Sequence, residues 1–158
     1  MKRIYRIQLI FVLILIISLF PIDILQAQEN SNKDNTLEYV RIYSDSSGES
    51  HFEDLEIGLK EIEFAPPAPP IFTSDLNPSS SYGFISVLPA WESEWHPAPK
   101  RQYIVYLKGI IEAQVSDGEI RQFGSGSITL VEDTSGKGHK SRAIGTEQVV
   151  CVVIQLEE

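Results

Sequence analysis

The sequence predicts an all-β fold, a small barrel or sandwich, from three observations. Short segments rich in β-branched and aromatic residues recur along most of the chain. Gly, Asp and Ser residues separate these segments at intervals of roughly 8–12 residues, which is typical of barrels and sandwiches. Behind the N-terminal region, no segment has the roughly 3.6-residue apolar period of an amphipathic helix.

The N-terminal half is expected to hold strands on both sides of a proline-rich loop. Residues 37–43 are predicted to form a strand, residues 44–50 a turn, and residues 51–64 one or two strands. The run Pro66-Pro67-Ala68-Pro69-Pro70 has almost no N–H groups for a ladder, so we expect an extended polyproline loop there. Polar residues 73–81 continue the loop, and residues 82–88 resume as a strand.

The C-terminal half has a clearer sequence of strands and turns. Its expected strands are residues 102–107, 110–115, 120–123, 127–131 and 148–156. Ser116-Asp117-Gly118 has the Asp-Gly signal of a tight hairpin, and glycine-rich turns are expected at 124–126 and 136–138. The lone cysteine, Cys151, lies within an apolar run, where we expect a buried thiol without a chemical role.

The first 27 residues have the pattern of a secretion signal. Lys2, Arg3 and Arg6 precede an unbroken apolar run at 9–20, which is shorter than the roughly 20 residues of a membrane span. Ala27 is a suitable cleavage position, so we expect a signal helix at 1–27, a polar linker at 28–36 and one domain at 37–158. The alternative is an uncleaved membrane anchor formed by residues 4–24, which would favour an anchored structural or interaction protein.

The charge of the expected mature chain excludes some partners. Cleavage removes three of the 13 basic residues and one of the 22 acidic ones, which leaves 10 against 21 and a net charge of −11. Such a surface repels phosphate backbones and anionic lipids, so we expect no nucleic-acid partner and no membrane contact beyond the N-terminal segment. The expected location is extracytoplasmic, either periplasmic or secreted.

Two spaced motifs point to a family. The first, with His96, Ala98, Gln102 and Gly109, keeps the spacing of G-x5-H-x-H-x(3,4)-E-x6-G, with Ala90 at the opening glycine. The second begins at Gly126 and reaches His139 two residues later than G-x5-P-x-G-x2-H-x3-N would. Both motifs resemble those of the cupin superfamily, and the chain looks like a small single-domain bacterial cupin with a degenerate metal-binding motif.

The resemblance implies a cupin-type jelly roll, or double-stranded β-helix, and a candidate site at one end of the barrel. It implies metal ligation by His96, Gln102 and His139, although Ala98 cannot bind a metal and glutamine offers only a neutral carbonyl. If residues 91–96 are extended, alternation places Glu94 beside His96 as a replacement carboxylate. The metal would be Fe, Mn, Zn or Ni; the alternatives are a hydrogen-bonded His96 in a metal-free pocket and a His139 that belongs to a turn.

Three further residues are expected to line the pocket. Tyr106 shares strand parity with Gln102 and Ile104, so both Tyr106 and Ile104 are expected to point into the barrel. Trp95 is expected in the pocket wall. We therefore expect an exported protein that binds a small molecule in the barrel mouth; the alternative is a metal-dependent enzyme of the oxygenase or isomerase type. The resemblance also implies a homodimer.

Overall fold

A computed structural model describes residues 35–157, and these residues contain only strands, turns and loops. The strands are β1 (Thr36–Ser44), β2 (Ser50–Gly58), β3 (Lys60–Ile62), β4 (Ile71–Thr73), β5 (Ser79–Val87), β6 (Gln102–Lys108), β7 (Ile110–Val115), β8 (Ile120–Phe123), β9 (Ile128–Val131), β10 (His139–Ile144) and β11 (Val149–Leu156). Within that range no helix is long and apolar enough to cross a membrane. The predicted signal at 1–27 and most of the predicted linker lie outside the described residues.

The described chain divides into two compact units. One comprises residues 35–36 and 58–73, and the other comprises residues 37–57 and 74–157. In the first unit β3 and β4 form a short antiparallel hairpin, with Lys60 opposite Thr73. The backbone N–H of Ala68 donates to the carbonyl of Ala65 at 3.0 Å, so the proline-rich segment turns there. The expected extended polyproline conformation is therefore wrong at this point.

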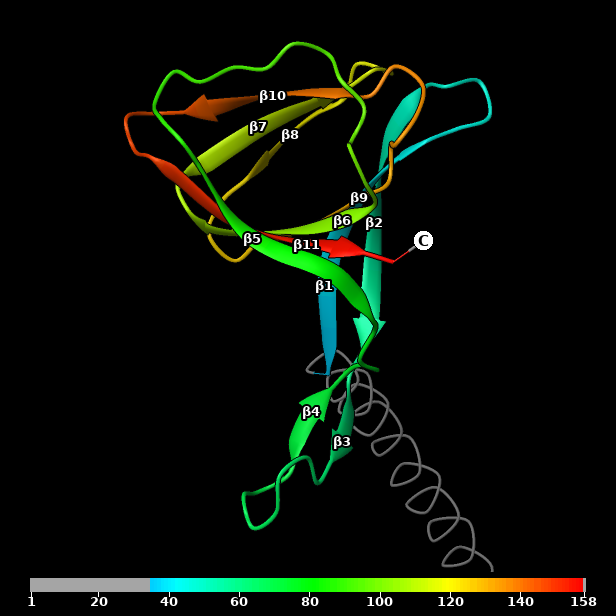
Figure 1. The fold of residues 1–158 in the computed structure, drawn as a ribbon, viewed down its shortest axis with the longest axis vertical. Coiled ribbons are helices and arrows are strands. Elements are labelled where there is room, and N and C mark those ends of the chain that lie inside the picture. The colour runs from blue at the N-terminus through cyan, green and yellow to red at the C-terminus, as the bar shows by residue number, and fades with distance from the viewer. Residues whose placement is uncertain (1–34, 158) are drawn as a thin grey trace, which may run out of the picture. The chain divides into compact units, whose positions relative to one another are not determined.

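The second unit is built from two sheets that face each other, as Figure 1 shows. The larger sheet has the strand order β2-β1-β9-β6-β11-β5, and the smaller has the order β10-β7-β8. Strands β1 and β9 run parallel, whereas β9–β6, β6–β11 and β11–β5 are antiparallel pairs. Apart from the consecutive strands β1 and β2, neighbours in this sheet are far apart in sequence, as expected when two sheets close on each other as a jelly roll. The predicted all-β jelly roll is confirmed.

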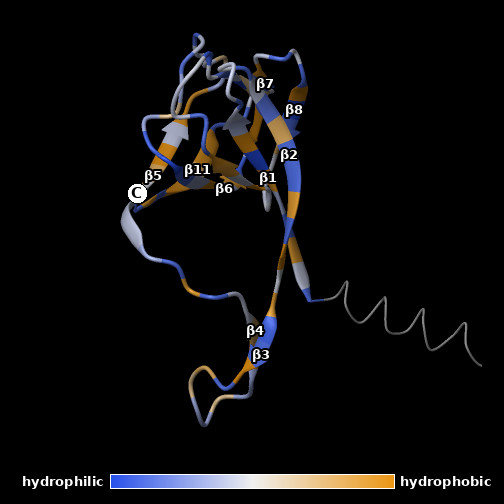
Figure 2. Cartoon of the chain, turned by 90° about the vertical axis from the view of Figure 1, so that its right-hand side faces the viewer, coloured by the Kyte–Doolittle hydropathy of each residue, from blue (hydrophilic) through white to orange (hydrophobic). Residues whose placement is uncertain are grey.

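Alternation along the strands places one apolar face of each sheet in the core. On β11, Val149, Cys151 and Val153 are buried while the intervening residues are only partly so. Figure 2 shows the same alternation of hydrophobic and hydrophilic residues along β2 and β7. Tyr106 of β6 stacks on Phe123 of β8 with ring centroids 5.6 Å apart, which joins the two sheets through the core. Each fully buried side chain of this size contributes about 1.5–3 kcal/mol.

Most predicted strands agree with the structure to within two or three residues, but two strands were missed. One is β4, which directly follows the proline-rich loop, and the other is β10. Residues 139–144 form β10, which pairs antiparallel with β7 over six residues. Lys140, Ser141 and Arg142 make this segment too polar to be recognised by its composition. It forms a strand because β7 supplies a complete ladder of partners, which is a tertiary effect.

Ala90 occupies the position at which the family motif has a glycine. Its φ of 65° lies in the left-handed region, and it is the only residue other than glycine with a positive φ among residues 35–157. A glycine would adopt this conformation without strain.

Candidate functional site

The second unit holds an apolar cavity of about 280 Å³ between its two sheets. Strands β5, β6, β7, β10 and β11 and the loop before β6 contribute to it. Eight of the lining residues are apolar: Ile85, Val87, Trp91, Ala98, Pro99, Ile104, Ile111 and Val149. The other six carry polar groups: His96, Gln102, Tyr106, His139, Ser141 and Cys151. An apolar wall with a few converging polar groups is the usual form of a small-molecule site.

The structure brings five of the predicted site residues together at this cavity. His96, Gln102 and His139 all line it, and so do Tyr106 and Ile104. Gln102 and His139 are buried, with 8% and 9% of their surfaces exposed, whereas His96 is exposed. The spacing of the two sequence motifs therefore located a real cluster of side chains. His139 is the first residue of β10 and does not belong to a turn.

Trp95 and Glu94 lie elsewhere. Trp91, not Trp95, lines the cavity, while Lys140 Nζ lies 5.5 Å from the centre of the Trp95 ring. Two backbone bridges join the loop before β6 to β10: Glu92 pairs with Arg142, and His96 pairs with His139. Between these bridges the loop has one residue more than β10. This bulge breaks the alternation on which the Glu94 prediction depended. The side chain of Glu94 is exposed, and its backbone carbonyl accepts a hydrogen bond from His96 Nδ1 at 2.8 Å.

His139 is held by a buried carboxylate. Its Nδ1 lies 2.6 Å from Oδ2 of Asp133, whose exposed fraction is 0%. A carboxylate can only accept, so Nδ1 carries the proton and donates it. Asp133 was not predicted as a site residue, because nothing in the sequence separates it from the solvated acidic residues of a turn. Its position in the segment between β9 and β10 brings it beneath the histidine.

The two histidines are neighbours in space. Their backbones exchange two hydrogen bonds of 3.0 Å, and their ring centroids are 4.8 Å apart at an interplanar angle of 49°. Nδ1 is engaged in both rings, by the Glu94 carbonyl in one and by the Asp133 carboxylate in the other. The Nε2 atoms of both rings have no hydrogen-bond partner among residues 35–157 and are available to a ligand.

Gln102 and Tyr106 place further polar groups in the cavity wall. The side-chain amide of Gln102 has no hydrogen-bond partner within residues 35–157, although the residue is only 8% exposed. A ligand that hydrogen-bonds to this amide gains about 0.5–1.5 kcal/mol. Burial raises the pKa of the Tyr106 phenol, which therefore stays protonated at neutral pH.

Cys151 lines the cavity but is not a reactive thiol. Burial raises its pKa to about 11, so almost no thiolate exists at neutral pH. The prediction of a buried thiol is confirmed.

The donor set does not fit a divalent metal. Open transition-metal sites usually take about three protein ligands, most often imidazoles with a carboxylate or thiolate. Among residues 35–157, no group of three His, Cys, Asp or Glu side chains is arranged to hold a metal ion. The cavity offers two imidazoles and the neutral amide of Gln102, and the only carboxylate beside them already accepts from His139. We therefore derive no step through a metal.

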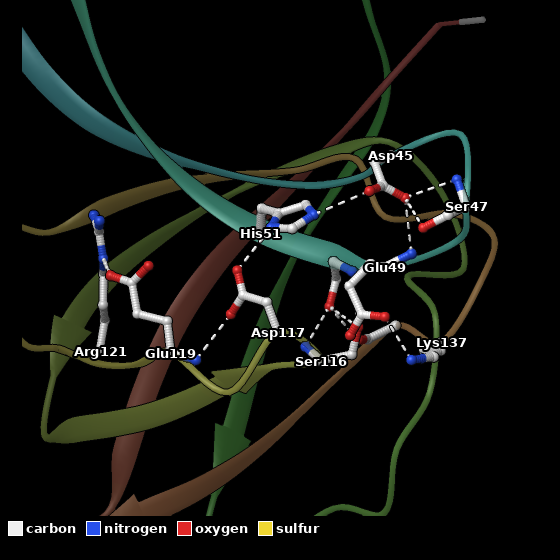
Figure 3. A network of polar contacts seen from close by, with 11 residues as sticks. Asp45, Ser47, Glu49, His51, Ser116, Asp117, Glu119, Arg121 and Lys137 are labelled. Atoms are coloured by element: carbon white, nitrogen blue, oxygen red, sulfur yellow. Dashed lines mark hydrogen bonds and ion pairs between the residues drawn. The ribbon is translucent and has the colours of Figure 1, made fainter.

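A second polar cluster lies around His51, to which the sequence assigned no role. Figure 3 shows His51 between two carboxylates: its Nδ1 is 2.7 Å from Asp117, and its Nε2 is 3.3 Å from Asp45. Asp45 belongs to the turn after β1, and Asp117 to the hairpin between β7 and β8. The Tyr43 ring lies against His51, with centroids 5.6 Å apart. His51 thus joins two turns that are distant in sequence.

This cluster predicts a pH-dependent contribution to stability. The hydrogen bond to Asp117 raises the pKa of His51 above its ordinary value of 6.5, and hydrogen bonds led by that of Ser47 lower the pKa of Asp45 to about 2. The histidine contribution is complete below pH 6.5 and is lost as pH rises through the raised pKa. The aspartate contribution is complete above pH 3.8 and is lost as pH falls towards 2. Both therefore act together between these two values.

We expect His51→Gln to lower Tm at pH 5 and to have no effect at pH 9. Because the groups are partly exposed, the difference at pH 5 should be only on the order of a degree or two. Thermal melts of both proteins at the two pH values measure it. An equal loss at pH 5 and pH 9 would instead assign the role of His51 to its packing against Tyr43.

The fold and the cavity show where the two sequence motifs lie in the structure. The first motif supplies the loop before β6 and β6 itself, and the second leads from β9 to the start of β10. Their histidines meet across one cavity between two facing sheets. The fold is a cupin-type jelly roll.

No family model matches the sequence, and no curated protein matches it. Solved structures similar to this cupin-type barrel include a Cupin 2 conserved barrel domain protein from Salinispora arenicola. That similarity has a TM-score of 0.42 and 19% identity, over 64% of this chain and 76% of that one. The cupin domain of Schizosaccharomyces pombe Cnp3 has a TM-score of 0.41 and 13% identity, over 78% of this chain and 85% of that one.

A third similar structure is a cupin-2 domain containing protein from Shewanella frigidimarina. Its TM-score is 0.37 and its identity 17%, over 48% of this chain and 69% of that one.

Proposed function

We propose that this protein is an exported binding protein that holds a small, mostly apolar molecule in the cavity of its barrel. The observation that carries the proposal is the cavity of about 280 Å³ with eight apolar residues in its lining. Pockets for drug-sized ligands run from about 300 to 1,000 Å³, so this one suits a molecule of about one substituted ring. The polar groups of His96, Gln102 and His139 would orient such a ligand.

A second, larger pocket is less suitable for an apolar ligand than the barrel cavity. It measures about 620 Å³ and lies over β1, β2 and β8, where charged residues such as Glu38, Asp54 and Arg121 line it. Charged, solvated walls gain little from an apolar ligand. In the barrel cavity, by comparison, nearly every wall position is apolar or uncharged, so ligand burial is favourable there.

A cavity-filling variant tests the proposal. Val87 lines the cavity from β5, whereas Val152 of β11 does not line it. With ethylbenzene as the probe, Val87→Phe is expected to weaken binding at least about tenfold, because the added ring occupies the ligand volume. Val152→Phe, the matched control, should bind as the wild type does. Titration calorimetry on variants with wild-type circular dichroism measures this, and equal binding by both variants would contradict the proposal.

The alternative function is the metal-dependent oxygenase or isomerase that the family resemblance implies. Elemental analysis of the purified protein separates the two functions. A stoichiometric metal that is lost in His96→Ala would favour the enzyme, and a metal-free protein that binds ethylbenzene would favour the binding function.

Export is the second part of the proposal and is supported by the basic front and the apolar run at 9–20. We expect mass spectrometry of the protein from its native host to find a mature N-terminus near Gln28. A full-length chain in the membrane fraction would instead support the anchor at 4–24.

A further inference from the structure

The polar groups of the cavity suggest which chemical class of ligand it selects, and this inference rests on the binding function proposed above. Two observations carry it: the hydrogen-bond state of His139 and the unpaired amide of Gln102. Both residues are more than nine-tenths buried and both line the cavity. His139 Nε2 and the Gln102 amide have no hydrogen-bond partner within residues 35–157, so both can pair with a ligand in the cavity.

Asp133 determines what His139 offers to a ligand. Because Nδ1 donates to the Asp133 carboxylate at 2.6 Å, the neutral ring has an unprotonated Nε2. That nitrogen is an acceptor, and it needs a donor such as a hydroxyl group. The Asp133 carboxylate is itself fully buried behind the ring, so it holds the tautomer as a positioning residue and has no contact with solvent.

Gln102 completes the recognition. Its amide has a carbonyl that accepts and an NH₂ group that donates, and neither is hydrogen-bonded within residues 35–157. A ligand hydroxyl that donates to His139 still has lone pairs, and the Gln102 amide can donate to one of them. A single hydroxyl would thus pair with both side chains, whereas an apolar ligand would pair with neither.

The charge of the site excludes ions. None of the described residues that line the cavity is Lys, Arg, Asp or Glu. The cations next to lining residues in the sequence, Lys100, Arg101, Lys140 and Arg142, are not among them. Arg101 is paired with Glu132, Arg142 with Glu112, and Lys140 lies over the Trp95 ring. An anion would enter an apolar space without a cation and close to the negative charge of Asp133, which is costly.

We propose that the cavity selects a neutral phenol or alcohol with an apolar frame, whose hydroxyl donates to Nε2 of His139 and accepts from the amide of Gln102.

Four probes of nearly the same shape test this selection: ethylbenzene, 4-ethylphenol, 4-ethylanisole and 4-ethylbenzoate. We expect wild-type protein at neutral pH to bind 4-ethylphenol about tenfold more tightly than 4-ethylanisole, which has no donor. The benzoate should bind weakest of all. Equal affinity for the phenol and its methyl ether, or tighter binding of the benzoate, would overturn the inference.

The variant Asp133→Asn tests which nitrogen of the His139 ring carries the proton, because it keeps the ring and changes its partner. In Asp133→Asn the amide can donate to Nδ1, which places the proton on Nε2 and makes it a donor. The preference for the phenol over the ether should then disappear, while affinity for ethylbenzene is unchanged. A structural role for Asp133 alone would change the affinity for all probes together, and that result would contradict its positioning role.

Gln102→Leu gives an independent check, because it keeps the volume and removes the amide. We expect it to lower the affinity for 4-ethylphenol several-fold relative to the affinity for ethylbenzene. If ethylbenzene binds and no variant or probe shows selectivity, only the ligand class proposed here is wrong. If none of the four probes binds to the wild type, the proposed binding function falls as well.

Discussion

Gly138→Ala is expected to destabilise the protein by about 3–5 kcal/mol and to disrupt the histidine pair. Gly138 has a φ of 70°, which strains any residue with a Cβ. A Cβ there would also overlap the backbone carbonyl of His96 and the nitrogen of Pro97. Backbone atoms cannot move aside as a flexible side chain does, so the loop that carries His96 would separate from β10.

Gly118→Ala is the matched control for this prediction. Its φ of 101° is also positive, but a Cβ there would meet nothing within 4 Å. It should therefore show only the conformational strain, about 1–2 kcal/mol. Urea unfolding of both variants measures the difference, which isolates the steric contact with His96. Similar losses in the two variants would show that the loop before β6 can move without loss of stability.

His139→Leu is expected to cost about 3–5 kcal/mol, because it leaves the buried Asp133 carboxylate without its partner. Asp133 has no exposed surface, and its Oδ1 already has no hydrogen-bond partner within residues 35–157. Removal of the imidazole would therefore leave both oxygens unpaired. Ligand affinity for 4-ethylphenol should fall in the same variant, since the acceptor is lost.

The double variant Asp133→Asn with His139→Leu separates charge from packing. Neutralising the carboxylate removes most of the penalty, so the double variant should be more stable than His139→Leu alone. Chemical denaturation of the wild type, both single variants and the double variant gives this cycle. If the double variant is less stable than His139→Leu, the unpaired charge of Asp133 is not the main cause of the stability lost in His139→Leu.

Much of the fold could be predicted because its strands have a local signature. The hairpin β7–β8 is an example: apolar alternation on both sides of Asp117-Gly118 predicted its two strands and its turn. β10 had no such signature, because Lys140 and Arg142 dominate its composition. β10 is a strand because its backbone pairs with β7, and the composition of β10 does not predict this pairing.

The candidate site was predictable only in part, for a related reason. Motif spacing along the chain located His96, Gln102 and His139, and strand parity located Ile104 and Tyr106. Period-two alternation did not extend to Glu94, because a bulge between Glu92 and His96 interrupts it. A bulge depends on the partner strand and leaves no reliable mark in the sequence.

The all-β class, the turns and the motif residues could be read from local pattern, because hydrophobic alternation and turn chemistry act over a few neighbouring residues. How those residues act together depends on the packing of distant strands. This packing placed Asp133 beneath His139 at 2.6 Å, and it left the Gln102 amide facing an apolar cavity. Hydrogen-bond partners and burial arise between strands far apart in the chain, so they follow from packing and cannot be derived from local pattern.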